Sequence, residues 1–423
     1  MISRTMGRRE FFMAAGCLAG SACVGPSRPG QLSSSLFDWK LHAPAQLGMS
    51  PSGVEEIRSL MRRFVDTNVH TGNIVAIARS NKLVMYEAQG VRNVETGAPM
   101  RTDDIFRMMS STKVVTAVAV MMIAEEGRIS IDDPVRRFIP SFKNIKVAGP
   151  DGNLVAPDRE VTIKHLLTHT SGLNLESAAA RLQPIERATS DTLDTFIPRY
   201  GEAVLDFQPG SKWAYSGLPA FDVLLYIVQK VSGVPANAFV RERILEPLGM
   251  SDTFFQVPTA KAERVLPLYA REKDEWRPQQ PVFSGSSAYI SGAGGLFSTA
   301  HDYMQFEQML YNRGELNGRR VLRSASVDAI ARNHVGDLYA SSFGPYTVGM
   351  GFGLGVKVAV EPNVNTFVSQ GRGSFGWSGA YGTETWVDPE NDLSVVYFVQ
   401  QPSILALVEF QKVVCQAVGA TDA

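Results

Sequence analysis

Ser110 and Lys113 are the residues whose types and spacing first suggest chemistry. They stand near the start of residues 108–126, MMSSTKVVTAVAVMMIAEE, an apolar run that is followed by Gly127. Serine and threonine favour the beginning of a helix and glycine favours its end, so the run predicts a buried helix. An offset of three residues is nearly one helical turn. We therefore expect the Ser110 hydroxyl and the Lys113 amine to meet as nucleophile and base.

The start of this predicted helix also favours such chemistry electrostatically. Unpaired backbone N–H groups in a first turn stabilise the anion that forms during attack. The same positive end, together with burial among Met108, Met109 and Val114, favours the neutral amine of Lys113, which can accept the serine proton. The alternative is that Ser110 only caps a core helix and Lys113 reaches solvent. This stretch by itself leaves both interpretations open.

Composition limits the classes of function. The chain has 423 residues, of which 44% are hydrophobic and 20% charged, with a net charge of −1; this suits an enzyme with one large core or two lobes. The near-neutral balance and the lack of Lys/Arg runs give no support to nucleic-acid binding. No Cys/His cluster has zinc spacing, and His165 and His169 lack the intervening glutamate of a metalloprotease helix. We expect neither a metal nor a cofactor.

Residues 1–30 are expected to be an export signal outside the fold. Arg8 and Arg9 precede an apolar run of small residues, 13–25, which resembles a twin-arginine signal and is too short for a spanning helix. We therefore expect an exported protein, periplasmic or secreted, without a membrane span; a cytosolic protein with a basic start is the alternative. The residues before Cys23 match a lipoprotein cleavage box poorly, so a lipid anchor there stays open but is not favoured.

Strand-like runs occur near both ends of the rest of the chain. Residues 74–78 and 83–87 flank one turn, and residues 383–388 and 393–400 flank another. Between them the sequence shows mostly helical patterns and loops. Strands at both ends with helices between them predict an α+β fold, in which one antiparallel sheet is assembled from the two ends and flanked by helices.

These patterns predict a single catalytic domain over residues 31–423 that consists of two lobes. The sheet lobe takes about 35–105 and 330–423, and a mainly helical lobe, about 106–330, is inserted between them. We expect the catalytic cleft between the lobes, which is where ligand sites are preferentially found.

Two further stretches carry candidate chemistry. Residues 208–217, QPGSKWAYSG, place Tyr215 in a turn-rich loop, from which its phenol can reach a cleft and relay a proton to a leaving group. Nothing local distinguishes this tyrosine from a partly buried core residue. Residues 373–386, GSFGWSGAYGTETW, combine many glycines with a strand, which indicates close approach of backbone to a ligand or a tight bend.

Together the three stretches resemble the serine β-lactamase and penicillin-binding-protein superfamily, and within it the class C-like branch with the family VIII carboxylesterases. FRMMSSTK at 106–113 matches the S-x-x-K motif, Tyr215 matches the tyrosine of Y-x-N, and WSG at 377–379 takes the place of K-T-G. The resemblance covers about residues 35–415. Supporting matches are LLTHTSG at 166–172, PLGM at 247–250 and GGLFSTAHD at 294–302.

The resemblance implies a β-lactamase/transpeptidase-like fold with Ser110 as the nucleophile, Lys113 as its base and Tyr215 as the proton relay. It also implies an oxyanion hole made by the backbone N–H groups of Ser110 and Ala380. His169 and His301 are expected to be structural. The residues implied in substrate binding are Trp377, Ser378, Gly379 and Gly217.

Two departures from the family pattern favour an ester as the substrate. Gly217 stands where β-lactamases carry an asparagine that holds a ligand amide. Trp377 replaces the lysine that receives a β-lactam carboxylate. Both changes resemble the esterase branch, where a W-x-G third motif is common. We therefore expect a serine hydrolase that cleaves small-molecule carboxylic esters through an acyl-enzyme on Ser110.

The nearest alternatives keep the same acyl-enzyme and change the acyl donor or acceptor: a β-lactamase, a D-amino-acid peptidase, an amide hydrolase or an acyltransferase. The two departures argue against the first two, and nothing in the sequence excludes the last. A non-catalytic ligand sensor on the same fold is the remote alternative. The acyl length, the alcohol and the oligomeric state are not determined; residues 146–160, 176–195 and 335–346 are the candidate walls of the cleft.

Overall fold

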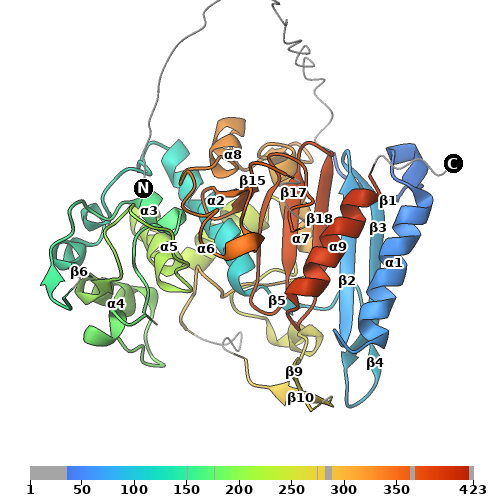
Figure 1. The fold of residues 1–423 in the computed structure, drawn as a ribbon, viewed down its shortest axis with the longest axis horizontal. Helices are drawn as coiled ribbons and strands as arrows, with labels where there is room; N and C mark the ends of the chain where they lie inside the picture. The colour runs from blue at the N-terminus through green and yellow to red at the C-terminus, as the bar shows by residue number, and fades with distance from the viewer. Residues whose placement is uncertain are drawn as a thin grey trace, which may run out of the picture. The chain divides into compact units, whose positions relative to one another are not determined.

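The computed structural model describes residues 36–418 except 150, 176, 274, 282–287 and 363–366. In this part of the chain, a nine-stranded sheet contains strands from both ends (Figure 1). Its order is β1-β3-β2-β18-β17-β16-β15-β14, with β4 beside β3. Neighbouring strands are antiparallel except for β1 and β3, which are parallel. The predicted sheet is confirmed, with one parallel pair added at its edge. The expected export signal and Cys23 lie outside the described residues. The strands are β1 (Asp38–Leu41), β2 (Gly72–Arg79), β3 (Lys82–Asn93), β4 (Ala98–Pro99), β14 (Met350–Phe352), β15 (Lys357–Ala359), β16 (Phe375–Ser378), β17 (Glu384–Asp388) and β18 (Leu393–Phe398).

The pairing of β2 with β18 connects the N-terminal hairpin to the C-terminal strands. Its register runs from Arg79 opposite Leu393 to Ile74 opposite Phe398. The hairpin of β2 and β3 closes with a two-residue loop, Ser80 and Asn81, and both have positive φ. This is the backbone of a type I′ turn, whose twist matches that of the strands.

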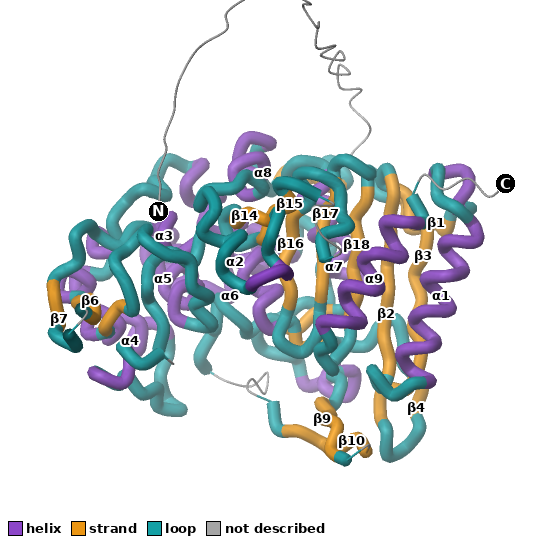
Figure 2. Tube along the Cα trace, in the orientation of Figure 1, coloured by secondary structure: helices purple, strands orange, loops and turns teal. Residues whose placement is uncertain are grey.

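Two helices cover one face of the sheet. Figures 1 and 2 show α1 (Pro51–Asp66) and α9 (Ile404–Gln416) side by side across the strands. The helix α1 begins where Ser50 accepts a hydrogen bond from the Gly53 amide at 2.9 Å, which is an ordinary N-cap. Its buried side chains recur every three or four residues, as the sequence pattern predicts, and pack into one cluster with the sheet and α9. They are Val54, Ile57, Leu60, Met61 and Phe64.

The opposite face of the sheet is covered by α7 (Ala300–Tyr311), which packs against β17 and β18. This helix falls within the range expected for the helical lobe, yet its contacts belong to the sheet. The helix α2 (Thr112–Glu125) is buried on nearly every side. A helix that is apolar all round must lie inside a core, and α2 packs there against α5 (Pro219–Ser232).

Short helices and strand pairs complete the fold. Among the described residues no single helix is long and apolar enough to cross a membrane; α5 with residues 236–245 reaches that length and composition only across an 86° bend. The other α-helices are α3 (Ile163–Leu167), α4 (Leu193–Phe196), α6 (Ala236–Val240) and α8 (Ser324–Ile330). The short strands are β5 (Phe106–Arg107), β6 (Lys146–Ala148), β7 (Leu154–Val155), β8 (Val204–Leu205), β9 (Leu268–Glu272), β10 (Glu275–Gln279), β11 (Phe297–Ser298), β12 (Glu315–Leu316) and β13 (Arg319–Arg320). The remaining short helical segments are η1 (Pro44–Leu47), η2 (Met109–Ser111), η3 (Val135–Arg137), η4 (Pro140–Asn144), η5 (Ala180–Leu182), η6 (Ile197–Glu202), η7 (Arg241–Leu245), η8 (Thr259–Arg264) and η9 (Gly344–Tyr346).

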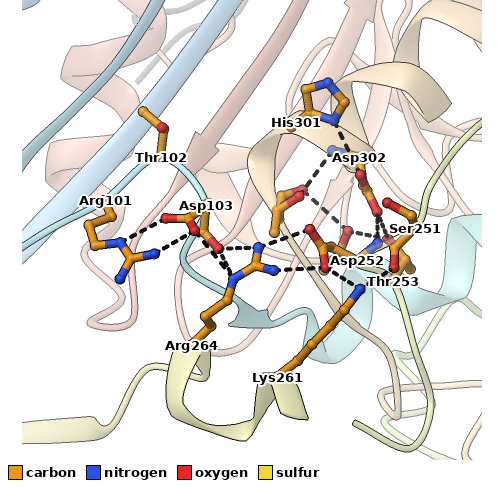
Figure 3. A network of polar contacts seen from close by, with 12 residues as sticks. Arg101, Thr102, Asp103, Ser251, Asp252, Thr253, Lys261, Arg264, His301 and Asp302 are labelled. Carbon is orange, nitrogen blue, oxygen red and sulfur yellow. Dashed lines mark hydrogen bonds and ion pairs between the residues drawn. The ribbon is translucent and has the colours of Figure 1, made fainter. Parts of the chain in front are cut away.

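A polar network fixes the segment that leads into β5 and η2 (Figure 3). The Arg264 guanidinium donates to the carbonyl of Asp103 and to both carboxylate oxygens of Asp252. The Asp302 carboxylate, near the start of α7, accepts from the Asp252 amide at 2.6 Å and the Thr253 hydroxyl at 3.0 Å. Three segments distant in sequence are thereby joined just before the chain reaches Ser110.

We expect Phe410→Ala to lower the free energy of unfolding by about 3–5 kcal/mol, because it empties the space of a fully buried ring that stacks on Tyr397 at 4.3 Å. Leu405→Ala on the same helix is the control; its side chain is 70% exposed, and the expected cost is below about 0.5 kcal/mol. Urea unfolding followed by circular dichroism measures both. Equal costs for the two variants would contradict the packing of α9.

Candidate active site

Ser110 lies in the single turn η2, directly before α2, and not inside α2 itself. The preceding residue, Met109, has a φ of +46°, which is rare for a residue other than glycine. This bend turns the chain from β5 into the helix. The predicted helix is confirmed, but the backbone strain before the serine has no signal in the sequence.

The Lys113 amine is held inside the protein by two backbone carbonyls. Its Nζ donates to the carbonyl of Gly217 at 2.6 Å and to that of Ala293 at 2.9 Å, and it lies 3.1 Å from Ser110 Oγ. The side chain is fully buried, which excludes the alternative in which Lys113 reaches solvent. Once it has given up a proton, a lysine amine has two N–H bonds and one lone pair. With both N–H bonds on carbonyls, the lone pair is left for the Ser110 proton.

Tyr215 approaches the same oxygen from the loop before α5. Its hydroxyl donates to Ser110 Oγ at 2.6 Å. Burial acts to raise the pKa of this phenol, but the charge of Lys113 and the hydrogen bond with Ser110 outweigh it, and the pKa of Tyr215 falls below its usual value of 10. The structure therefore brings together all three residues that the sequence proposes for catalysis.

His169 supports the Tyr215 loop and does not contact Ser110. Its Nδ1 accepts from the Ser216 amide at 3.1 Å, its carbonyl accepts from the Ala214 amide at 3.0 Å, and its ring packs 4.8 Å from that of Tyr215. Complete burial, and then the charge of Lys113, hold the pKa of His169 well below its usual range, so it stays a neutral acceptor. His301 stacks on Trp39 at 4.1 Å instead. Both contacts are structural, as expected from the sequence.

The end of β16 is pressed against η2, where an oxyanion hole is expected. The Thr383 hydroxyl donates to the carbonyl of Met108 at 3.1 Å, and a Cβ on Gly379 would come within 2.3 Å of the same oxygen. Only glycine permits this approach. Neither the Ser110 amide nor the Ala380 amide donates to any acceptor in the described part of the chain. Both amides can therefore donate a hydrogen bond to a negative charge that develops on a substrate oxygen.

The other candidate binding residues divide between two places. Trp377 is buried, with its ring 5.6 Å from that of Tyr215, and forms an apolar wall of the site. A Cβ on Gly217 would meet nothing within 4 Å, so open space lies there. Ser378 lines a separate cavity of about 190 Å³ with His70 and residues of α9. The contacts of Ser378 do not join it to Ser110.

The three candidate wall loops also differ in what they contribute. Residues 335–346 place Tyr339 and Phe343 on Trp213, two residues before Tyr215, at ring distances of 4.8 and 5.5 Å. From the range 176–195, Ile185 and Arg187 line a cavity that Gly217 also lines. Residues 146–160 form β6 and β7 and supply no residue to that cavity.

Asp222 is a residue of this site that the sequence analysis missed. It is fully buried in the first turn of α5 and accepts from the Tyr289 hydroxyl at 2.8 Å, the Ser291 hydroxyl at 2.7 Å and the Ala293 amide at 3.1 Å. These bonds fix the segment whose Ala293 carbonyl holds Lys113. Burial raises the pKa of Asp222 to about 6, although the three hydrogen bonds oppose this. A single acidic residue in the apolar pattern of α5 was the available signal.

The raised pKa of Asp222 predicts a pH-dependent stability. Because the folded pKa exceeds the unfolded one, the associated stability is present below about pH 3.8 and is lost as the pH rises through about 6. A rise in the pKa from 3.8 to about 6 corresponds to about 3 kcal/mol of stability. Asp222→Asn cannot ionise. Relative to wild type, we expect its free energy of unfolding to improve by about 3 kcal/mol from about pH 4 to about pH 7.

Urea unfolding of both proteins at the two pH values measures this difference, and any constant cost of altered hydrogen bonds cancels. Asp151→Asn, at an exposed turn position, serves as the control that should show no such change. A wild-type-to-variant difference that is the same at both pH values would contradict the raised pKa.

Metal ligands are not grouped in this site: among the described residues no three His, Cys, Asp or Glu side chains cluster in a way that could hold a metal ion. The geometry instead offers a nucleophile, a base, a second proton carrier and two free backbone amides. Those parts are the ones that acyl transfer through a serine requires.

Comparison with known proteins shows which family this chain resembles. The profile of the Beta-lactamase family matches residues 57–408. Esterase EstB of Burkholderia gladioli is 33% identical over 355 residues, which are 77% of this chain and 84% of EstB. Protein Rv1367c of Mycobacterium tuberculosis is 33% identical over 357 residues, 80% of this chain and 88% of its own. The solved structure of EstCE1, a hydrolase with promiscuous acyltransferase activity, has a TM-score of 0.72 at 26% identity, over 87% of this chain and 99% of its own.

Proposed function

We propose that this chain, which belongs to the beta-lactamase family, hydrolyses carboxylic esters through an acyl-enzyme on Ser110. The observation that carries the proposal is the arrangement around one oxygen atom. Lys113 Nζ lies 3.1 Å from Ser110 Oγ with its other partners already in place, and the Tyr215 hydroxyl lies 2.6 Å from the same Oγ. One group is set to take a proton there and the other to deliver one.

The first half of the reaction follows from these positions. The Lys113 amine removes the Ser110 proton while Oγ bonds to the ester carbonyl carbon, and the carbonyl oxygen becomes an anion held by the amides of Ser110 and Ala380. The Tyr215 phenol then protonates the alkoxy oxygen as its bond to carbon breaks. The Lys113 ammonium returns its proton to the tyrosine. In the second half, water repeats these transfers and releases the acid.

The wall of the site favours an ester over a β-lactam. Trp377 offers an indole ring where a cation would be needed to pair with a β-lactam carboxylate. Gly217 offers open space where an amide-holding side chain would be needed. Similarity to a relative named as an esterase, EstB, and to EstCE1 supports the same substrate class.

Steady-state kinetics on p-nitrophenyl acetate and a chromogenic cephalosporin test the assignment. We expect clear ester turnover with little cephalosporin turnover, and we expect Ser110→Ala to abolish both. Ser211→Ala, in the exposed part of the Tyr215 loop, is the matched control and should retain wild-type rates. A fluorophosphonate should add to the peptide that contains Ser110. Wild-type turnover by Ser110→Ala would refute the nucleophile, and preferential cephalosporin hydrolysis would refute the substrate class.

The role of Tyr215 predicts a dependence on the leaving group. We expect Tyr215→Phe to lower the kcat for an alkyl ester such as ethyl butanoate by about 10²–10⁴-fold, since an alkoxide leaves poorly without a proton. A p-nitrophenyl ester should lose less, because p-nitrophenolate needs no proton to leave. Alkali titration at constant pH measures the first reaction and absorbance the second. Equal losses on both esters would place Tyr215 outside leaving-group protonation.

Transfer of the acyl group to an alcohol is the second candidate reaction. The observation that favours it is the similarity to EstCE1, whose description names an acyltransferase activity. Product analysis with 1-butanol added to the ester assay distinguishes the two outcomes. Hydrolysis alone gives only the acid, whereas transfer gives the butyl ester from the same acyl-enzyme.

A further inference from the structure

Thr383 belongs to one of the two backbone segments that carry the oxyanion amides, those of Ser110 and Ala380, and it bonds to the other. Its side chain is fully buried, directly before β17. Its carbonyl accepts from the Gly379 amide at 2.7 Å, which closes a turn over residues 379–383. Ala380 lies within this closed turn. The main chain of Thr383 therefore fixes the segment that presents the Ala380 amide.

The side chain of Thr383 reaches the second segment. Its hydroxyl donates to the carbonyl of Met108 at 3.1 Å, and Thr383 Oγ1 lies 3.0 Å from the Ser111 hydroxyl oxygen. A hydroxyl carries one proton, so Thr383 Oγ1, which donates to Met108, accepts from Ser111. Met108 stands two residues before Ser110, and Ser111 stands directly after it. Thr383 thus holds the chain on both sides of Ser110.

The segment that Thr383 holds is strained. Met109 has a φ of +46°, and such a conformation persists in a residue other than glycine only where the surrounding structure imposes it. The Tyr303 hydroxyl also holds this segment, by donating to the Ser111 carbonyl at 2.8 Å, but Tyr303 lies on α7 and not on the closed turn. Without the hydroxyl of Thr383, the segment can relax relative to that turn and carry the Ser110 amide with it.

The hydrogen bonds of Thr383 do not involve the reacting oxygen. The partners of Ser110 Oγ are Lys113 Nζ at 3.1 Å and the Tyr215 hydroxyl at 2.6 Å. Thr383 can therefore influence the reaction only through the position of the two amides. Donors of an oxyanion hole must be aimed at the place where the charge develops, and a misplacement of about 1 Å can cost about 10²-fold in rate.

We propose that Thr383 is the positioning residue of the oxyanion hole. Its main chain fixes the Ala380 amide and its hydroxyl fixes the Ser110 amide, so one residue sets the spacing between the two donors. The inference rests on the proposed esterase function. The competing interpretation is that the hydroxyl only satisfies the buried carbonyl of Met108 and stabilises the fold. Spacing acts on the transition state, whereas stability acts on the amount of folded enzyme, so the two interpretations can be separated.

Kinetics on p-nitrophenyl acetate, with rates expressed per folded molecule, give the first comparison. Thr383→Val removes the hydroxyl and keeps the shape, and its kcat should fall about 10–10²-fold with KM largely unchanged. Both half-reactions form a tetrahedral anion, so this holds whichever half is slower. Thr383→Ser keeps the hydroxyl and should restore most of the wild-type kcat. Thr385→Val, the same change at a fully buried position two residues further along, is the matched control and should keep the wild-type kcat.

Binding of a boronic acid is a readout that a purely structural role would not change. Butylboronic acid adds to Ser110 Oγ, the serine proton passes to Lys113, and the tetrahedral boronate places an oxygen at the two amides. Its dissociation constant, from calorimetry on protein shown to be folded by circular dichroism, should rise about 10–10²-fold in Thr383→Val. It should stay at the wild-type value in Thr385→Val.

Wild-type kcat and boronate affinity in folded Thr383→Val would overturn the proposal. An equal loss in Thr383→Ser or in Thr385→Val would also overturn it, because packing would then explain the effect. If Thr383→Val does not fold, Ser111→Ala removes one partner of Thr383 and should lose about fivefold in kcat and in boronate affinity; no loss there would again overturn the proposal. If wild type cleaves no ester, the esterase function fails, and the boronate affinities still decide the role of Thr383.

Discussion

The structure depends on keeping one amine, that of Lys113, inside the protein without an ion pair to any of the described residues. Taking an amine out of water is costly unless its hydrogen bonds are replaced. Here the replacements are the carbonyls of Gly217 and Ala293, which lie far from Lys113 in sequence. Hydrogen bonds from two other buried residues hold the segments that carry these oxygens. Asp222 fixes the segment with Ala293, and His169 fixes the loop with Gly217.

A second constraint is the contact between the end of β16 and η2. Gly379 lets strand backbone lie against the carbonyl of Met108, and Thr383 bonds to the same oxygen and to the Ser111 hydroxyl. The end of β16 is thereby connected to the start of α2 through backbone and hydroxyl groups. The amides of Ser110 and Ala380 need no particular side chain. Their spacing nevertheless depends on Gly379, where no side chain fits.

Local pattern accounts for what the sequence could predict. The apolar face of α1, the two hairpins and the Ser110–Lys113 offset each depend on neighbours within a few residues, and each is found in the structure. The partners of Lys113 could not be predicted in this way, because Gly217 and Ala293 act through carbonyls that every residue has. The strained φ of Met109 is imposed by the surrounding packing. The assignment of α7 to the sheet likewise depends on tertiary contacts and not on its own pattern.

The place of β18 has a consequence for how the protein must be made. It is the last strand of the described chain, yet it lies in the middle of the sheet and is the partner of β2. Until β18 has been synthesised, β2 has an open edge, and the contact that closes it spans about 300 residues. Contacts of such long range make folding slow, and open edges favour association with other chains. Synthesis that stops shortly before β18 therefore leaves the edge of β2 open, and the sheet can close only after β18 has been made.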